Sequence, residues 1–358
     1  MPYNRDFLAY LTRSTKPYRL CLSYFASFPT NILSMVVFTK HGLKERINLC
    51  LFFQSLADIL FMTASFLIYS DRIYLEISGM SRRGPVFRFF VNNYLVGLYG
   101  FGWTSGFMTA VIACERCFCI ISPLRSQTVL KTKSMLILIL VAFFFILCGF
   151  FVVGSRWSIT CIFDPRTNSS FSELYPSKFS LLHKKLVNTL DGYVYGIMLP
   201  GTTMSIVSIS TIITVVILNK LALWREQSST AAMTVRDVAL TRMLVGCSVL
   251  FVVTTVPVVA FRVSTLFVPD VSLHGRYYNT FNFMGSVTEL LAYVNSSCNF
   301  FIYYTMGRKF RTTVHELCCR KDKVKPKVAV RAKLSLVGPR QDQSDQRSAS
   351  TATTDTIA

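Results

Sequence analysis

The chain has 358 residues, of which 52% are hydrophobic and only 16% are charged, and its formal net charge is +20. Soluble globular proteins carry roughly 25% charged residues, so this composition argues against a soluble domain and favours a surface that faces lipid. The positive charge does not indicate nucleic-acid binding, because the basic residues lie between apolar runs and near the C-terminus and coincide with no nucleic-acid motif.

Seven apolar runs predict an all-α fold, an integral membrane bundle of seven transmembrane helices. A helix needs about 20 residues to cross a bilayer, and runs of this length lie at 20–39, 47–70, 86–121, 134–156, 190–219, 238–267 and 278–306. The N-terminus lacks the features of a signal peptide, so the first helix is expected to act as its own insertion signal. The expected parts are an N-terminal segment (1–19), the bundle (20–306), an amphipathic surface helix (307–319) and a disordered tail (320–358).

The basic residues predict an extracellular N-terminus and a cytoplasmic C-terminus at the plasma membrane. Lys and Arg are more numerous in the loops and tail that this orientation places in the cytoplasm than in the opposite loops, which agrees with the positive-inside rule. Four basic residues before the first helix oppose this orientation, namely Arg5, Arg13, Lys16 and Arg19.

Asp58 is an ionisable residue inside the second apolar run, where a charge is costly and usually functional. Other runs offer polar partners for it, namely Asn31, Ser105, Asn295, Ser296 and Asn299. Asn295 and Asn299 are four residues apart and therefore share one helical face. Two interpretations stay open: an oxygen-rich cluster that holds a sodium ion or waters, and a hydrogen-bonded polar core without an ion.

A second charged group lies at the inner end of the third run, at Glu115 and Arg116. Adjacent residues point in different directions on a helix, so Arg116 is expected to need another partner, and Asp237 at the start of the sixth run is available. An Arg116–Asp237 pair would join two helix ends and latch a movable helix 6. The alternative is a pair of interfacial charges that reach toward water.

The segment after the seventh run predicts a short amphipathic helix. Phe310, Val314, Leu317 and Cys318 share one face, and nearby basic residues favour the anionic inner leaflet. Cys318 and Cys319 are then placed for palmitoylation. An ordinary surface helix with two thiols is the alternative.

These features resemble the rhodopsin-like (class A) G-protein-coupled receptors over residues 20–319. The matching positions are Asn31, Asp58, Glu115, Arg116, Pro123, Leu124, Pro200, Phe251, Pro257, Asn295, Asn299, Tyr303 and Phe310. The resemblance implies a receptor, not an enzyme, that activates a heterotrimeric G protein through movement of helix 6. It implies an activation switch at Glu115, Arg116, Asp237, Phe251, Pro257, Asn299 and Tyr303. It implies a sodium pocket at Asp58, Ser105, Asn295, Ser296 and Asn299.

The resemblance also implies regulation by a receptor kinase and arrestin, for which the polar tail offers hydroxyl groups. These are Ser335, Ser344, Ser348, Ser350, Thr351, Thr353, Thr354 and Thr356. Phosphate on them would add negative charge that a basic partner reads.

Several positions depart from the family pattern, and they predict a switch that moves differently from that of well-known members. Cys117 stands where the family has Tyr, Phe300 where it has Pro, and Thr254-Thr255 where it has Cys-Trp. The helix 3 Cys of the usual outer disulfide is Val91, which leaves Cys161 to pair with Cys21 or to stay unpaired. In the same outer loop, Asn168-Ser169-Ser170 is a glycosylation sequon.

The candidate ligand residues lie in the outer halves of the runs: Leu98, Tyr99, Trp103, Tyr193, Arg262, Glu289 and Tyr293. Leu98 and Tyr99 stand where amine receptors carry an Asp, and Tyr293 stands where opsins carry their retinal Lys. A peptide or a chemosensory small molecule is therefore expected, with Arg262 and Glu289 either clamping a zwitterion or pairing with each other. The motifs resemble those of peptide and chemosensory-like receptors of molluscs and related invertebrates.

Two other classes of membrane protein stay as alternatives. A channel or transporter needs a polar path or broken helices in matching halves, whereas the polar residues here gather around one site. A membrane enzyme needs a nucleophile, a base or a metal set. The four His residues are scattered in loops and the surface helix without metal-ligand spacing.

Overall fold

The computed structural model describes residues 23–78, 85–165, 168–227, 235–268, 270–271 and 275–318. All of these residues belong to one compact unit, which spans Met1–Cys319. The predicted N-terminal segment (1–19) and tail (320–358) lie outside the described residues.

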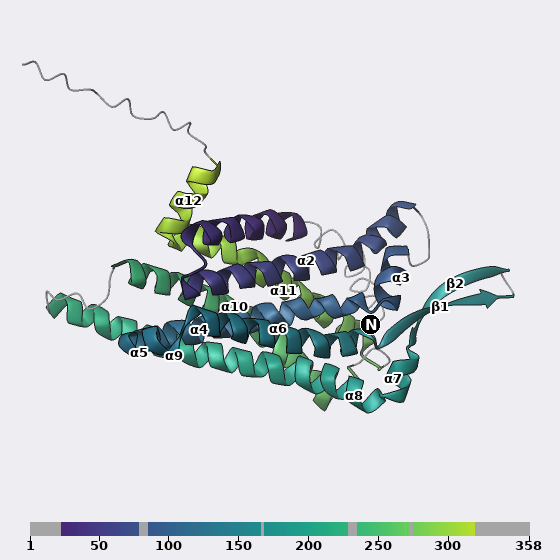
Figure 1. Cartoon of the computed structure of the whole chain (residues 1–358). Helices are drawn as coiled ribbons and strands as arrows, with labels where there is room; N and C mark the ends of the chain where they lie inside the picture. The colour runs from purple at the N-terminus through teal and green to yellow at the C-terminus, as the bar shows by residue number, and fades with distance from the viewer. Residues whose placement is uncertain are drawn as a thin grey trace, which may run out of the picture. The chain divides into compact units, whose positions relative to one another are not determined.

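Long helices that run alongside one another make up most of the described chain (Figure 1). They are residues 23–41, α2 (Arg46–Ser78), α4 (Gly100–Ile121), α6 (Thr132–Gly154), α9 (Leu199–Gln227), α10 (Val235–Phe267) and α11 (Tyr278–Met306). The shorter elements are α3 (Pro85–Asn92), η1 (Leu95–Tyr99), α5 (Pro123–Val129), β1 (Trp157–Asp164), β2 (Ser169–Pro176), α7 (Lys178–Leu182), α8 (Lys184–Asn188), η2 (Thr189–Met198) and α12 (Arg308–Cys318). The predicted fold class, an all-α membrane bundle, is confirmed.

Five helical segments within the described ranges are apolar and long enough to cross a membrane. They are Arg46–Ile68, Leu95–Ile121, Thr132–Gly154, Lys184–Leu221 and Val238–Phe267. The first helix and α11 lie alongside them (Figure 1). α11 is not among these five segments, and it carries polar residues such as Glu289 and Asn299. Polar residues in membrane helices usually face the bundle interior, and Asn299 is buried there.

The prediction of one continuous helix over 86–121 is wrong. α3 ends at Asn92, and Tyr94 then has a φ of 58°, in the left-handed region. A non-glycine residue in this conformation interrupts an α-helix. A new helix starts with η1 and continues as α4. Hydropathy does not register such a break, because the residues on both sides of it are apolar.

A two-stranded antiparallel hairpin, β1–β2, extends from one end of the bundle (Figure 1). The analysis of apolar runs did not predict it, although β1 contains the β-favouring residues Trp157, Ile159, Thr160 and Ile162. The backbone N–H of Ile159 donates to Asn92 Oδ1 at 2.9 Å, which ties β1 to α3. The end that carries the hairpin is called the hairpin end below, and the opposite end, with α5 and α12, the α12 end.

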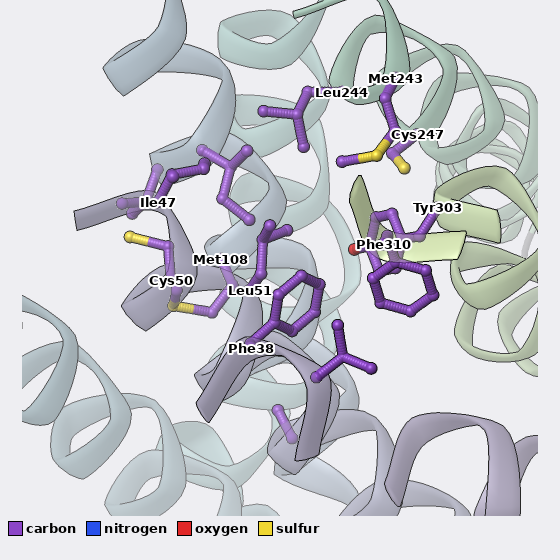
Figure 2. Packing of buried hydrophobic residues seen from close by; sticks show 14 of the residues in the cluster. Phe38, Ile47, Cys50, Leu51, Met108, Met243, Leu244, Cys247, Tyr303 and Phe310 are labelled. Atoms are coloured by element: carbon purple, nitrogen blue, oxygen red, sulfur yellow. The ribbon is translucent and has the colours of Figure 1, made fainter. Parts of the chain in front are cut away.

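The largest cluster of buried apolar side chains lies toward the α12 end (Figure 2). Phe38 of the first helix, Tyr303 of α11 and Phe310 of α12 meet there with ring centroids 5.5–5.6 Å apart. Val314 is buried as well, and Leu317 packs against the cluster. The apolar face predicted for α12 therefore packs against the bundle, while Cys318 is exposed.

Candidate functional site

Asp58 is a fully buried carboxylate held by neutral donors from two other helices. Ser105 Oγ of α4 and Ser296 Oγ of α11 donate to Asp58 Oδ1 at 2.7 and 2.8 Å, and Asn299 Nδ2 donates to Oδ2 at 3.3 Å. The exposure of Asp58 is 0%. No Lys, Arg or His among the described side chains forms an ion pair with it. These four residues form the polar cluster, and they are four of the five predicted for the sodium pocket.

The first helix supports this cluster indirectly. Asn31 Nδ2 donates to the backbone oxygen of Ser296 at 3.1 Å and to Ser27 Oγ at 3.0 Å. Asn31 therefore holds the backbone of α11 at the residue whose hydroxyl reaches Asp58. Asn295, the fifth predicted member, lines the cavity described below and is not among the described side chains that donate to Asp58.

The polar contacts continue from Asp58 toward the α12 end. Gln54 Nε2 donates to Thr109 Oγ1 at 3.0 Å, and Thr109 Oγ1 donates to the backbone oxygen of Ser105 at 3.3 Å. Gln54 and Thr109 are both buried. The sequence analysis missed this bond, although Gln54 precedes Asp58 by four residues and so shares its helical face.

At the α12 end of α4, Glu115 and Arg116 bind each other. Arg116 Nε and Nη2 donate to the two oxygens of Glu115 at 2.5 and 2.7 Å. The expectation that adjacency keeps the two side chains apart is wrong, because the long arginine side chain folds back along the helix. The exposure of the Glu115 side chain is only 1%, so its charge depends on nearby cations.

Arg46, the first residue of α2, is a second cation for Glu115. Its Nε lies 3.7 Å from Glu115 Oε1. Its Nη1 donates to the backbone oxygens of Ser126 and Leu130 at 2.5 and 2.8 Å. Arg46 therefore connects α2, α4 and the end of α5. In the sequence, Arg46 is one of several basic residues between apolar runs, and nothing there marks it as a partner of Glu115.

Asp237, the predicted latch partner of Arg116, lies in α10, but its side chain is outside the described part of the chain. The Arg116–Asp237 latch therefore stays a prediction.

A cavity of about 260 Å³ lies between α4, α9, α10 and α11, nearer the hairpin end than the polar cluster. Aromatic side chains, hydroxyl groups and two charged residues line it. They include Phe61, Tyr99, Trp103, Ser105, Phe150, Thr203, Phe251, Thr254, Thr255, Arg262, Thr288, Glu289, Tyr293, Asn295 and Ser296. Five of the seven predicted ligand residues are among them. Leu98 and Tyr193 do not line the cavity, and the Tyr193 side chain is 55% exposed.

The π-helix η2 lies beside this cavity, and α6 holds it in place. Tyr195 of η2 donates its hydroxyl to the backbone oxygen of Ile146 at 2.7 Å. Arg156 forms an ion pair with Asp191 and also donates to Asn188. The Tyr195 ring lies 6.5 Å from the ring of Trp103, which lines the cavity. π-Helices occur frequently at functional sites.

A family model for the serpentine seven-transmembrane chemoreceptors called Srw, which are G-protein-coupled receptors, matches residues 18–321. The chain belongs to this family. No curated protein matches the chain. The family match confirms the G-protein-coupled receptor class and its chemosensory branch, and it identifies the chain as a receptor and not an enzyme.

In this Srw receptor, the polar cluster and Phe251 of α10, one of the residues predicted for the switch, both adjoin the cavity. Ser105 and Ser296 belong to the cluster and line the cavity. Phe251 also lines it and is buried against Ala110, Ala113 and Val207. A ligand in the cavity of this receptor would therefore touch both groups directly.

Two predicted modifications of the receptor fall partly outside the described residues. Cys161 lies exposed on β1, but Cys21 is outside the described residues, so the disulfide is untested. Cys318 ends α12, and Cys319 is likewise outside.

Proposed function

We propose that this Srw chemoreceptor binds a small extracellular molecule in the 260 Å³ cavity and activates a heterotrimeric G protein through movement of α10. One observation carries the proposal: the cavity wall includes Phe251 of α10 and two residues of the polar cluster. A ligand there changes the packing of α10 directly, and differential contact with two states is what shifts a conformational equilibrium.

The size of the cavity favours a small molecule over a peptide. Ligand pockets usually measure about 300–1,000 Å³, and this cavity lies just below that range. A peptide could place only one terminal residue in a cavity of this size. The aromatic walls favour a largely apolar body, and Arg262 and Glu289 favour polar or charged groups at its ends.

Trp103→Ala tests this assignment, with Tyr193→Ala as its matched control. Both variants remove an aromatic ring near the hairpin end, but only Trp103 lines the cavity. Receptor-driven nucleotide exchange would be measured on a panel of G proteins, with tissue extract and its fractions as the ligand source. We expect Trp103→Ala to raise the half-maximal dose about tenfold or more, because the ligand loses a buried aromatic contact. Tyr193→Ala should leave the half-maximal dose unchanged. Equal shifts would reject the cavity.

We also propose that the hairpin end is extracellular and that Asn168 is glycosylated. Asn168 lies exposed between the two strands, with a φ of 46°. A glycan on Asn168 requires the hairpin to face the lumen during synthesis. Glycosidase treatment should lower the mass of the unmodified receptor and leave the mass of Asn168→Gln unchanged. This result would support both claims.

The α12 end is then cytoplasmic. There Cys318 and Cys319 are proposed palmitoylation sites, and the hydroxyl residues of the tail are proposed phosphorylation sites for a receptor kinase and arrestin. Replacing the eight tail hydroxyl residues by Ala is expected to reduce arrestin recruitment.

The polar cluster is a proposed sodium site of the inactive state. Its oxygen atoms include one buried carboxylate and two hydroxyls, and such hard oxygen ligands suit a hard monovalent cation. The described residues supply no cation to Asp58, so an ion would balance its charge. The cavity adjoins the polar cluster through Ser105 and Ser296.

A further inference from the structure

Two arginines lie within 4 Å of the buried Glu115 carboxylate at the α12 end. Arg116 holds Glu115 through two hydrogen bonds, and Arg46 lies 3.7 Å from Glu115 Oε1. The side chains of Arg46 and Arg116 are 19% and 14% exposed, whereas that of Glu115 is 1% exposed. The carboxylate therefore cannot turn to water when Arg116 leaves, and an unpaired buried charge is unfavourable.

Arg46 is held in place by the last turn of α5. The backbone oxygens of Ser126 and Leu130 accept from its Nη1, and Cys119 Sγ lies 3.7 Å from its Nη2. Carbonyl groups at a helix C-terminus carry partial negative charge and favour a cation. Thr132 Oγ1 donates to the backbone oxygen of Lys44 at 2.8 Å, a second tie between the same two loops. Because a guanidinium presents several N–H groups in a planar fork, Arg46 can donate to these carbonyls and lie beside Glu115 at the same time.

We propose that Arg46 is a positioning residue that holds α5 against α4 and keeps Glu115 neutralised when Arg116 turns away from it. Arg46 then lowers the free energy needed to release Arg116, and it couples this release to the position of α5. The proposal rests on the proposed activation of a G protein, because release of Arg116 is read out as nucleotide exchange.

The test compares Arg46→Gln in two backgrounds. With Glu115 present, Arg46→Gln leaves Arg116 as the only cation for the carboxylate, so Arg116 is held more tightly. Basal exchange should fall on the order of tenfold, because the buried carboxylate loses one of its two cationic partners. With Glu115→Gln, no carboxylate needs a cation, so adding Arg46→Gln should change exchange little. Lys44→Gln is the matched control, because Lys44 is an exposed base two residues away.

A fall of equal size in both backgrounds would mean that Arg46 is merely structural, and the proposal would be overturned. A rise in exchange with Arg46→Gln would overturn it as well. Arg46→Lys keeps the charge but loses the fork, so it should retain most of the exchange activity.

A second measurement does not depend on any G protein. Deuterium uptake by the amides of residues 123–131 is measured on the purified full-length receptor. Uptake should be faster in Arg46→Gln and Arg46→Lys than in the unmodified receptor, and unchanged in Lys44→Gln. If the receptor drives no exchange at all but uptake follows this order, the proposed signalling fails and the positioning of α5 stands. Unchanged uptake in both Arg46 variants rejects the positioning role.

Discussion

Asp58 and Glu115 are two buried carboxylates on adjacent helices, and they are stabilised in opposite ways. Asp58 accepts hydrogen bonds from two serines and an asparagine and has no cationic partner among the described side chains. Glu115 has two arginines within 4 Å. The described side chains supply no cation to the first site and one more cation to the second than its charge requires.

This difference separates two roles within one bundle. A site with unbalanced negative charge can take up a mobile cation, and its protein donors need not move far. A site with surplus positive charge can release one arginine to another partner while the carboxylate stays neutralised. The polar cluster is therefore suited to sensing an ion, and the Glu115 site to exchanging partners.

The largest expected effect is a difference in stability between two isosteric substitutions. Glu115→Gln removes the buried anion that two arginines share and should lower the free energy of unfolding by about 3 kcal/mol, the cost of breaking a buried ion pair from one side. Asp58→Asn removes an unbalanced buried charge and should cost nothing in potassium buffer. Unfolding of the purified receptor in micelles measures both. Equal losses would show that Asp58 has a cation outside the described residues.

In sodium buffer, Asp58→Asn should no longer match the stability of the unmodified receptor. An ion that binds only the folded inactive state stabilises the unmodified receptor, by about 1.4 kcal/mol when its concentration is ten times the dissociation constant. Asp58→Asn should abolish this increment, whereas Glu115→Gln should keep it. The comparison is made in sodium and potassium at equal ionic strength. Identical melting temperatures of the unmodified receptor in the two salts would rule out the sodium site.

The sequence predicted the partners of Asp58 better than those of Glu115, and the reason is geometric. Ser105, Ser296 and Asn299 are short side chains at similar depth in the membrane, so their position on the helix nearly determines their contacts. Arg46 and Arg116 have long side chains that reach in several directions, and spacing alone does not select one. The bend at Tyr94 and the hairpin were missed because they depend on backbone conformation, which hydropathy does not encode.

A smaller effect is expected from the predicted latch between Arg116 and Asp237. Asp237→Ala should raise basal nucleotide exchange about fivefold, because a partly exposed ion pair contributes about 1 kcal/mol. Arg116→Ala should lower exchange, since the arginine is expected to contact the G protein after it is released. Exchange is measured at matched surface expression. Changes of the same sign in the two variants would exclude the latch, and α10 would then be held by packing around Phe251.

The last effect concerns the hydrogen bond between the two carboxylate sites. Thr109→Val leaves the buried amide of Gln54 without its acceptor and should cost about 1–2 kcal/mol of stability. Gln54→Leu should cost less, because Thr109 still donates to the backbone oxygen of Ser105. The double variant replaces both partners by apolar groups of similar shape, so it should be more stable than Thr109→Val alone. Unfolding of the three variants in the same micelles gives the interaction free energy between Gln54 and Thr109. If the two single costs simply add, the Gln54–Thr109 bond contributes nothing, and the polar contacts between Asp58 and Glu115 stop at Ser105.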